Sequence, residues 1–389
     1  MKKNCLFCVL LPLMVSCQGT SIFKDNIQKL DPATKASIQM KVNDFSYRLY
    51  DIVNDEFADE NVVISPLSCS NAVSLAGLGA SGDTFDEIAS ALGTDAISNE
   101  ELGSYSYEVW KSLKDADEKV TMVSANSIWL GDDFHVKSDY KKQASLYYDA
   151  KVSSVGGSSA GKVINQWVAE KTNSLIKNAV PDDFSLQDMA FVNAVYFNSP
   201  WPSEPRKTSM PFHAIDGTAS SQSTIMFEEA FLSFSNDKWQ YVSLPFGEEK
   251  TFCLELIQPK GASDLDISKD VAAIRSAAKK NHLDVYIPII DITTSTTLDG
   301  ALQHLGMKKA FKSSADFGKI TDKPLCLGTV YHNAMIRVDE KGGVGAASTV
   351  ISGPTAAGPG EEVRFDQPFV FFISEATTGT VLFIGHKLK

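Results

Sequence analysis

The feature that most constrains this chain is a run of nineteen residues, Gly342 to Gly360, that carries no charge. Six of these residues are glycine, four are alanine and two are proline. Its first half, residues 344–351, could pair as a β-strand, whereas residues 353–360 could not. A loop of this length inside a compact domain is uncommon and is usually either functional or disordered. Because exposed small residues are also easily cut by proteases, we expect a fold that keeps this loop for a purpose.

Helical periodicity dominates the first third of the sequence, and strand-like runs dominate the last half. We expect helices over residues 33–57, 68–78, 160–177 and 298–305, and another that begins at Thr84 with Glu87 in a capping-box pattern. The expected strands cover residues 62–64, 120–130, 189–197, 239–245, 251–258, 283–292, 329–338, 368–373 and 380–384. Because helices and strands do not alternate regularly, the sequence predicts an α+β fold.

Charge and side-chain spacing exclude several classes of function. The chain has 36 Lys and Arg against 48 Asp and Glu, a net charge of −12, which disfavours binding to nucleic acid. Its six histidines are scattered, with no metal-ligand spacing. No phosphate-binding loop is present, and Gly342 lies in only a weak match to a dinucleotide-binding turn. We therefore expect neither a metal nor a cofactor.

The first residues of the chain have the pattern of an export signal. Lys2 and Lys3 precede an apolar run that ends at Cys17, and polar residues follow at once. This pattern predicts a bacterial lipoprotein: a signal over residues 1–16, lipid on Cys17 and a tether over 17–33. The expected location is the cell envelope, at the outer membrane or the cell surface. The alternative is ordinary cleavage beside an incidental cysteine.

Residues 157–161 match the G-x-S-x-G pattern of hydrolases, with Ser159 at its centre and Asp366 and His386 following in the order Ser, Asp, His. However, the preceding residues 151–155 are too polar for the central strand behind a nucleophile. We therefore interpret the motif as a flexible turn before a helix. A Ser159 hydrolase stays a remote alternative.

Five ordered segments resemble the serpin family, and together they cover about residues 34–389. These segments are Asn61–Ser68, Leu78–Ile88, Ile164–Asn173, Phe191–Trp201 and Asp366–Gly385. The resemblance implies a single domain with three β-sheets, about nine helices and an exposed reactive centre loop at about residues 341–365. It also implies a monomeric suicide-substrate inhibitor of serine proteases, not an enzyme. In such inhibitors the cleaved loop inserts into the central sheet and traps the acyl-enzyme.

The resemblance also assigns a hinge to the loop. It consists of Glu340, Gly342, Gly343, Val344, Gly345, Ala346, Ala347 and Ser348. Uncharged side chains suit insertion into a sheet, because a buried charge there is costly. Ile289 stands where relatives often have a lysine, so no ion pair to Glu340 is expected from that position. The extra glycines of this hinge predict slower insertion.

A second set of residues matches the region where the central sheet opens. The set is Ser65, Ser68, Asn193 and His332, with Trp201 at the top. Taken alone, these residues indicate a satisfied buried hydrogen-bond network, which would also control the opening of the sheet.

The cleaved bond is expected after Thr355, Ala356 or Ala357, depending on how the loop is counted. All three residues are small and uncharged, whereas trypsin-like proteases need Lys or Arg and chymotrypsin-like proteases need a large aromatic residue. We therefore expect an elastase-like target. The competing interpretation is a non-inhibitory serpin that acts as a binding protein or is merely a protease substrate.

Overall fold

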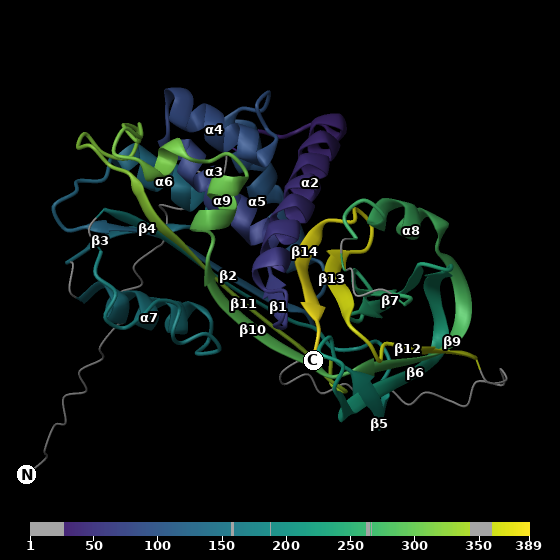
Figure 1. The fold of residues 1–389 in the computed structure, drawn as a ribbon. Coiled ribbons are helices and arrows are strands. Elements are labelled where there is room, and N and C mark those ends of the chain that lie inside the picture. Colours follow the sequence, from purple (N-terminus) through teal and green to yellow (C-terminus); the bar gives the residue numbers. More distant parts are fainter. Residues whose placement is uncertain (1–26, 157–158, 187, 262–264, 266, 343–359) are drawn as a thin grey trace, which may run out of the picture.

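The computed structural model describes residues 27–156, 159–186, 188–261, 265, 267–342 and 360–389. Most of the helices lie together in the upper part of Figure 1, and strands fill the centre and the lower right of the molecule. The helices of the described chain are α2 (Pro32–Glu56), α3 (Pro66–Gly79), α4 (Gly82–Leu92), α5 (Asn99–Asp115), α6 (Ser138–Tyr148), α7 (Ala160–Lys171), α8 (Val271–Ala277), α9 (Asp299–His304) and the 3₁₀ helix Lys309–Phe311. None of these helices is long and apolar enough to cross a membrane. Cys17 and the expected signal lie outside the described residues.

A five-stranded sheet forms the centre of the molecule. Its order is β10 (Ile290–Thr297), β11 (Leu327–Val338), β4 (Met189–Asn198), β2 (Thr121–Gly131) and β3 (Lys151–Val155). Helix α7 packs on one face of this sheet, and α3 and α9 lie over the other (Figure 1). Nine of the ten β4 residues are therefore buried, and the strand expected over residues 189–197 is confirmed.

A nine-stranded sheet makes up the second half of the molecule. Its order is β1 (Val62–Ile64), β14 (Val381–Lys387), β13 (Phe369–Glu375), β8 (Phe252–Pro259), β7 (Trp239–Phe246), β6 (Ala219–Ser235), β9 (Lys279–Pro288) and β12 (Glu361–Arg364), with β5 (Arg206–His213) beside β6. The α+β class is confirmed. The described strands form two hydrogen-bonded sheets, whereas three were expected. The long strand β6 pairs with β5, β7 and β9, and these pairings unite two of the expected sheets into one.

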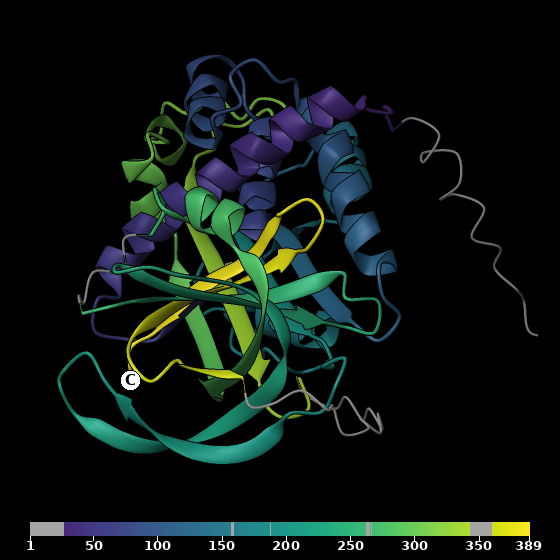
Figure 2. The same ribbon diagram turned by 90° about the vertical axis from the view of Figure 1, so that its right-hand side faces the viewer.

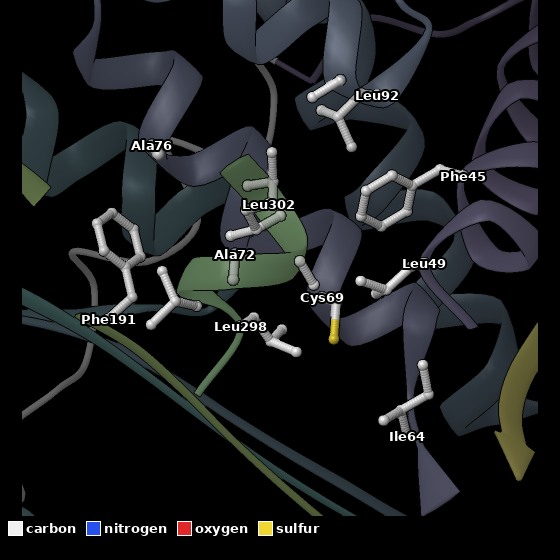
Figure 3. Close-up of a cluster of buried hydrophobic side chains, with 14 of the residues drawn as sticks. Phe45, Leu49, Ile64, Cys69, Ala72, Ala76, Leu92, Phe191, Leu298 and Leu302 are labelled. Carbon is white, nitrogen blue, oxygen red and sulfur yellow. The ribbon is translucent and has the colours of Figure 1, made fainter. Parts of the chain in front are cut away.

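The core beneath the helices is built around α3. All fourteen residues of α3 are buried, which small side chains permit. Cys69 and Ala72 of α3 converge with Phe45 and Leu49 of α2 and with Phe191 of β4 (Figure 3). Helix α2 crosses over the strands (Figure 2), and Asp31 caps its first turn. Phe45 and Leu49 are among its buried residues.

The expected capping box at Thr84 is wrong. Helix α4 begins at Gly82, and the Thr84 hydroxyl accepts a hydrogen bond from the Asp316 amide. The Glu87 carboxylate accepts from the amides of Lys308 and Lys309. Both side chains therefore hold a distant segment against α4. The capping box of this fold lies at Ser98 and Glu101, at the start of α5.

Two expected elements have different bounds. The strand expected over residues 283–292 is two strands, because the chain leaves β9 at Pro288 and enters β10 of the other sheet at Ile290. The helix expected over 160–177 ends at Lys171. The positive φ angles of Asn173 and Ser174 turn the chain, and the Thr172 hydroxyl satisfies the amide of Ile176.

Candidate functional site

The two central strands of the five-stranded sheet, β4 and β11, run parallel to each other. Their register pairs His332 with Asn193 and Ile336 with Phe197. The other neighbour of β11, strand β10, is antiparallel to it. Because β4 and β11 are parallel, they end side by side at Asn198 and Val338. We call this line between β4 and β11 the seam. If the chain turned back after β11 and formed a new strand between β4 and β11, that strand would run antiparallel to both of them.

A histidine–asparagine contact crosses the middle of the seam. Nδ1 of His332 lies 2.7 Å from Oδ1 of Asn193, and Nε2 of His332 lies 3.1 Å from the backbone nitrogen of Ser65. A backbone amide can only donate, so Nε2 is the acceptor and the proton resides on Nδ1, which donates to Asn193. The imidazole is therefore neutral and holds one defined tautomer.

Burial fixes this neutral state. The His332 side chain has no exposed surface, and its burial lowers the pKa to about 3. If Nε2 of His332 also carried a proton, two hydrogen-bond donors, this N–H and the Ser65 backbone N–H, would point at each other. The contact across the seam therefore persists at neutral pH.

The hydrogen-bond network continues from Asn193 toward the helices. Its amide nitrogen donates to the Ser68 hydroxyl of α3 and, at 2.6 Å, to Oδ1 of Asn126 on β2. The Ser68 hydroxyl in turn lies 3.2 Å from that of Ser124. The structure thus brings together the expected residues Ser68, Asn193 and His332, and it adds Ser124 and Asn126. These two polar residues occur within the strand expected over 120–130, and only their register opposite β4 reveals their role.

Ser65 joins this network in a different way from Ser68. It precedes α3 as the N-cap residue, yet its hydroxyl makes no cap and donates instead to the Leu382 carbonyl of β14, at 2.7 Å. Its backbone amide supplies the donor for His332. Ser65 therefore ties the seam to the nine-stranded sheet.

The hinge begins at the end of the seam marked by Asn198 and Val338, where the chain turns sharply after β11. Gly342 has a φ of +88°, and a Cβ placed there would lie 2.2 Å from the Ser199 carbonyl oxygen, which follows β4. Only glycine fits this close approach. Trp201 donates through Nε1 to the Asp339 carbonyl at 2.7 Å and stacks on Phe246 at a centroid distance of 4.2 Å. Trp201 therefore lies at the end of the seam where β11 stops and the hinge begins.

The hinge glutamate has a partner that sequence reasoning missed. Oε1 of Glu340 lies 2.5 Å from Nζ of Lys207 on β5, a strand of the other sheet. This contact lowers the pKa of the Glu340 carboxyl. No local pattern could identify Lys207, because the contact depends on where the β5–β6 hairpin lies relative to the end of β11.

Several expected site residues lie outside the described part of the chain. These are the hinge residues Gly343, Val344, Gly345, Ala346, Ala347 and Ser348 and the cleavage candidates Thr355, Ala356 and Ala357. The described chain resumes at Gly360 and enters β12, which pairs in parallel with β9.

The hydrolase residues are not brought together. The Ser159 hydroxyl is exposed at the start of α7 and donates to the Gly156 carbonyl. His386 is buried in β14, where Nδ1 accepts from the Tyr50 hydroxyl and Nε2 lies 2.8 Å from the Glu60 carbonyl. Strand β14 and helix α7 lie in different parts of the molecule (Figure 1). Ser159 is the residue that directly precedes helix α7.

Comparisons with known proteins identify relatives of the whole fold. A family model described as "Serpin (serine protease inhibitor)" matches residues 40–389. Human neuroserpin is 29% identical over 370 residues, which cover 89% of this chain and 90% of that protein. The native structure of tengpin, a thermophilic serpin, superposes with a TM-score of 0.83 at 27% identity, covering 93% of this chain and 95% of that one. Human thyroxine-binding globulin superposes with a TM-score of 0.82 at 21% identity, over 92% of this chain and 99% of that one.

Proposed function

Because this chain belongs to the serpin family, we propose that it is a suicide-substrate inhibitor of serine proteases. The observation that carries the proposal is the seam. Two parallel strands end together at a glycine-dependent hinge, and the uncharged segment Gly342–Gly360 follows directly. A strand added between β4 and β11 gains main-chain hydrogen bonds on both sides.

The proposed reaction begins as ordinary proteolysis. The protease serine attacks a carbonyl of the loop, its hydroxyl proton passes to the peptide nitrogen, and that peptide bond breaks. The C-terminal side leaves as an amine, the N-terminal side remains as an acyl-enzyme ester, and the loop segment after Glu340 then enters the seam. One alternating set of its side chains would face the sheet interior. This set is Gly343, Gly345, Ala347, Thr349 and Ile351, all of which are uncharged. Entry separates His332 from Asn193, so the network sets part of the barrier that traps the intact fold above the inserted form.

We further propose that the target protease has a shallow specificity pocket, as elastase does. The support is the sequence: Thr355, Ala356 and Ala357, the three candidates for the residue before the cleaved bond, are all small and uncharged. We also propose export and a lipid anchor on Cys17, on the pattern of the first seventeen residues. Replacement of Cys17 by Ser should then release the protein from the membrane fraction.

The test uses pancreatic elastase and a denaturing gel. Wild-type protein should form an SDS-stable complex, and the mass of the released C-terminal fragment should identify which bond is cut. Ala347→Arg places a charge on the inward-facing set and should give cleavage without complex. The matched control is Ala346→Arg, which has the opposite parity and should keep the complex.

Other outcomes favour other functions. Clean cleavage without complex, together with an unchanged melting temperature after the loop is nicked, would favour a non-inhibitory member. Thyroxine-binding globulin shares the fold, so the melting temperature of the nicked protein is measured to test for a non-inhibitory member. An esterase activity that Ser159→Ala abolishes would favour the hydrolase.

A further inference from the structure

The chain that follows the uncharged segment Gly342–Gly360 is held by a short edge strand. β12 has four residues, and β9 is its one partner among the described strands. Val363 is the single buried residue of β12, whereas Glu361 and Glu362 are exposed. The start of β12 is therefore its weaker end. Exposed pairings of this kind open locally at little cost in free energy.

Three carboxylates lie in one row across the neighbouring strands β6, β9 and β12. Asp284 of β9 is the register partner both of Glu228 on β6 and of Glu362 on β12. Register partners on adjacent strands point to the same face of a sheet, and adjacent strands are about 4.8 Å apart. Like charges that lie opposite each other in this way weaken strand pairing. We call Glu228, Asp284 and Glu362 the carboxylate row.

The two outer members of the carboxylate row each have an arginine partner, and the central member has none among the described residues. Arg206 lies 2.9 Å from Glu228, and Arg364 lies 2.9 Å from Glu362. The side chains of these arginines are 69% and 40% exposed. Water therefore screens their attraction for Asp284, and two cations stand against three carboxylates.

The environment of Asp284 adds to this imbalance. Asp284 is 9% exposed, and its Oδ1 makes no hydrogen bond with any described residue. A buried carboxylate oxygen without a donor is unfavourable, and repulsion from the two flanking glutamates increases the penalty. The penalty falls when β12 moves away, because Glu362 then leaves the row and water can reach Asp284. The carboxylate row thus favours the detached state of β12.

We propose that the carboxylate row loosens the start of β12, so that the chain after the cleaved bond can detach from β9 and enter the cleft of a protease. Ala357, the last of the three cleavage candidates, is four residues before Glu361. A protease cleft holds an extended stretch of several residues on either side of the bond, and that stretch reaches the start of β12. The role in cleavage rests on the proposed function, whereas the loosening of β12 rests on the row alone.

The loosening is tested by hydrogen exchange of the β12 amides in the intact protein, without any protease. Asp284→Asn keeps the shape of the side chain, removes the central charge and adds a donor for the flanking carboxylates. The protection factors of the β12 amides should rise about fivefold, because two like-charge contacts are relieved. Glu362→Gln should raise them about twofold, because it relieves one such contact and also loses the pair with Arg364.

The matched control is Glu361→Gln, which neutralises the adjacent residue of the same strand. The register partner of Glu361 is Leu283, so protection should stay at the wild-type value. In the Asp284→Asn/Glu362→Gln double variant, protection should rise less than the product of the two single effects, because both changes remove the same repulsion. Unchanged protection in Asp284→Asn, or an equal rise in Glu361→Gln, would overturn the proposal.

The role in cleavage is tested with proteinase K, whose broad specificity does not depend on an elastase-like target. Cleavage within residues 343–359 should be about fivefold slower in Asp284→Asn, because the rate follows the population of the opened chain. Asp237→Asn is the control, since it neutralises an exposed residue between β6 and β7 and should leave the rate unchanged. Equal rates in the wild type and Asp284→Asn would overturn this role. A failure of inhibition would be seen separately, as cleavage by elastase without an SDS-stable complex.

Discussion

Nδ1 of His332 donates to Oδ1 of Asn193 across 2.7 Å, and these two residues are register partners on the parallel strands β11 and β4. Their contact therefore closes the sheet at the line where the family fold would admit another strand. His332 also accepts from Ser65, and Asn193 donates to Ser68 and Asn126. Opening the seam at this point breaks a satisfied network, which opposes spontaneous insertion.

Replacement of His332 by Ala should weaken the closed sheet. The change leaves the Ser65 amide and the Asn193 oxygen without partners and creates a cavity. We expect the free energy of unfolding to fall by about 2–4 kcal/mol and the thermal midpoint of the uncleaved protein to drop clearly. His135→Ala is the control, because His135 is exposed and should change the midpoint little. Equal midpoints for the two variants would contradict a role of His332 in closing the seam.

The stability of the protein should fall as the pH drops below about 6.5. The unfolded chain protonates His332 near pH 6.5, whereas burial lowers the pKa in the folded state to about 3. Between these values the unfolded state binds more protons, so acid favours unfolding by up to about 1.4 kcal/mol per pH unit for this group. Burial also lowers the pKa of His386, which acts in the same direction.

Thermal midpoints measured from pH 7.5 down to pH 5 would show this dependence before most carboxylates titrate. His332→Gln keeps a polar side chain but removes the titrating group. Its midpoint should vary less over the same window, with the remaining slope due to His386. An unaltered slope in this variant would exclude His332 as the source.

Replacement of Gly342 by Ala should distort the hinge. The substitution forces an L-residue to a φ of +88° and places its Cβ 2.2 Å from the Ser199 oxygen. Gly217→Ala is a matched control, because Gly217 has a φ of +81° and no atom within 4 Å of the added carbon. Both variants lose about 1 kcal/mol from backbone strain. We expect Gly342→Ala to lower the thermal midpoint further, and equal shifts would show that the hinge moves away freely.

The ion pair between Lys207 and Glu340 should be weak and sensitive to salt. The Lys207 side chain is 66% exposed, so its Coulomb attraction is largely screened. A double-mutant cycle with Lys207→Ala and Glu340→Ala should give a coupling of about 0.2–1 kcal/mol that disappears at high ionic strength. A salt-independent coupling would instead indicate a buried contact. Arg206 and Glu228, paired nearby on β5 and β6, provide the reference cycle.

Much of this fold could be predicted from the sequence. The almost uninterrupted apolar run at Met189–Phe197 predicted a strand buried on both faces, and the spacing of Ile38, Val42, Phe45 and Leu49 predicted the long helix α2. The resemblance then selected His332 and Asn193, which the structure places in contact. These predictions succeeded because each depends on local periodicity or on a matched motif.

Other features could not be predicted, because they depend on long-range packing. Thr84 and Glu87 have the local spacing of a capping box, yet the segment around Lys308 and Asp316 recruits both side chains. The partner of Glu340 comes from β5, whose position follows from the β5–β6 hairpin and not from any local pattern. Pro288 marks the change from one sheet to the other within residues 283–292, which strand periodicity alone predicted as a single strand.

The place of β14 in the nine-stranded sheet has a consequence for biosynthesis. This strand lies between β13 and β1, with His386 opposite Val62, so the last strand of the chain pairs with the first. Val62 is synthesised long before His386, so β1 and β13 have no β14 to pair with until the end of the chain is made. Pairing across so long a separation folds slowly. These apolar strands therefore lack their cover until synthesis of the chain is nearly complete.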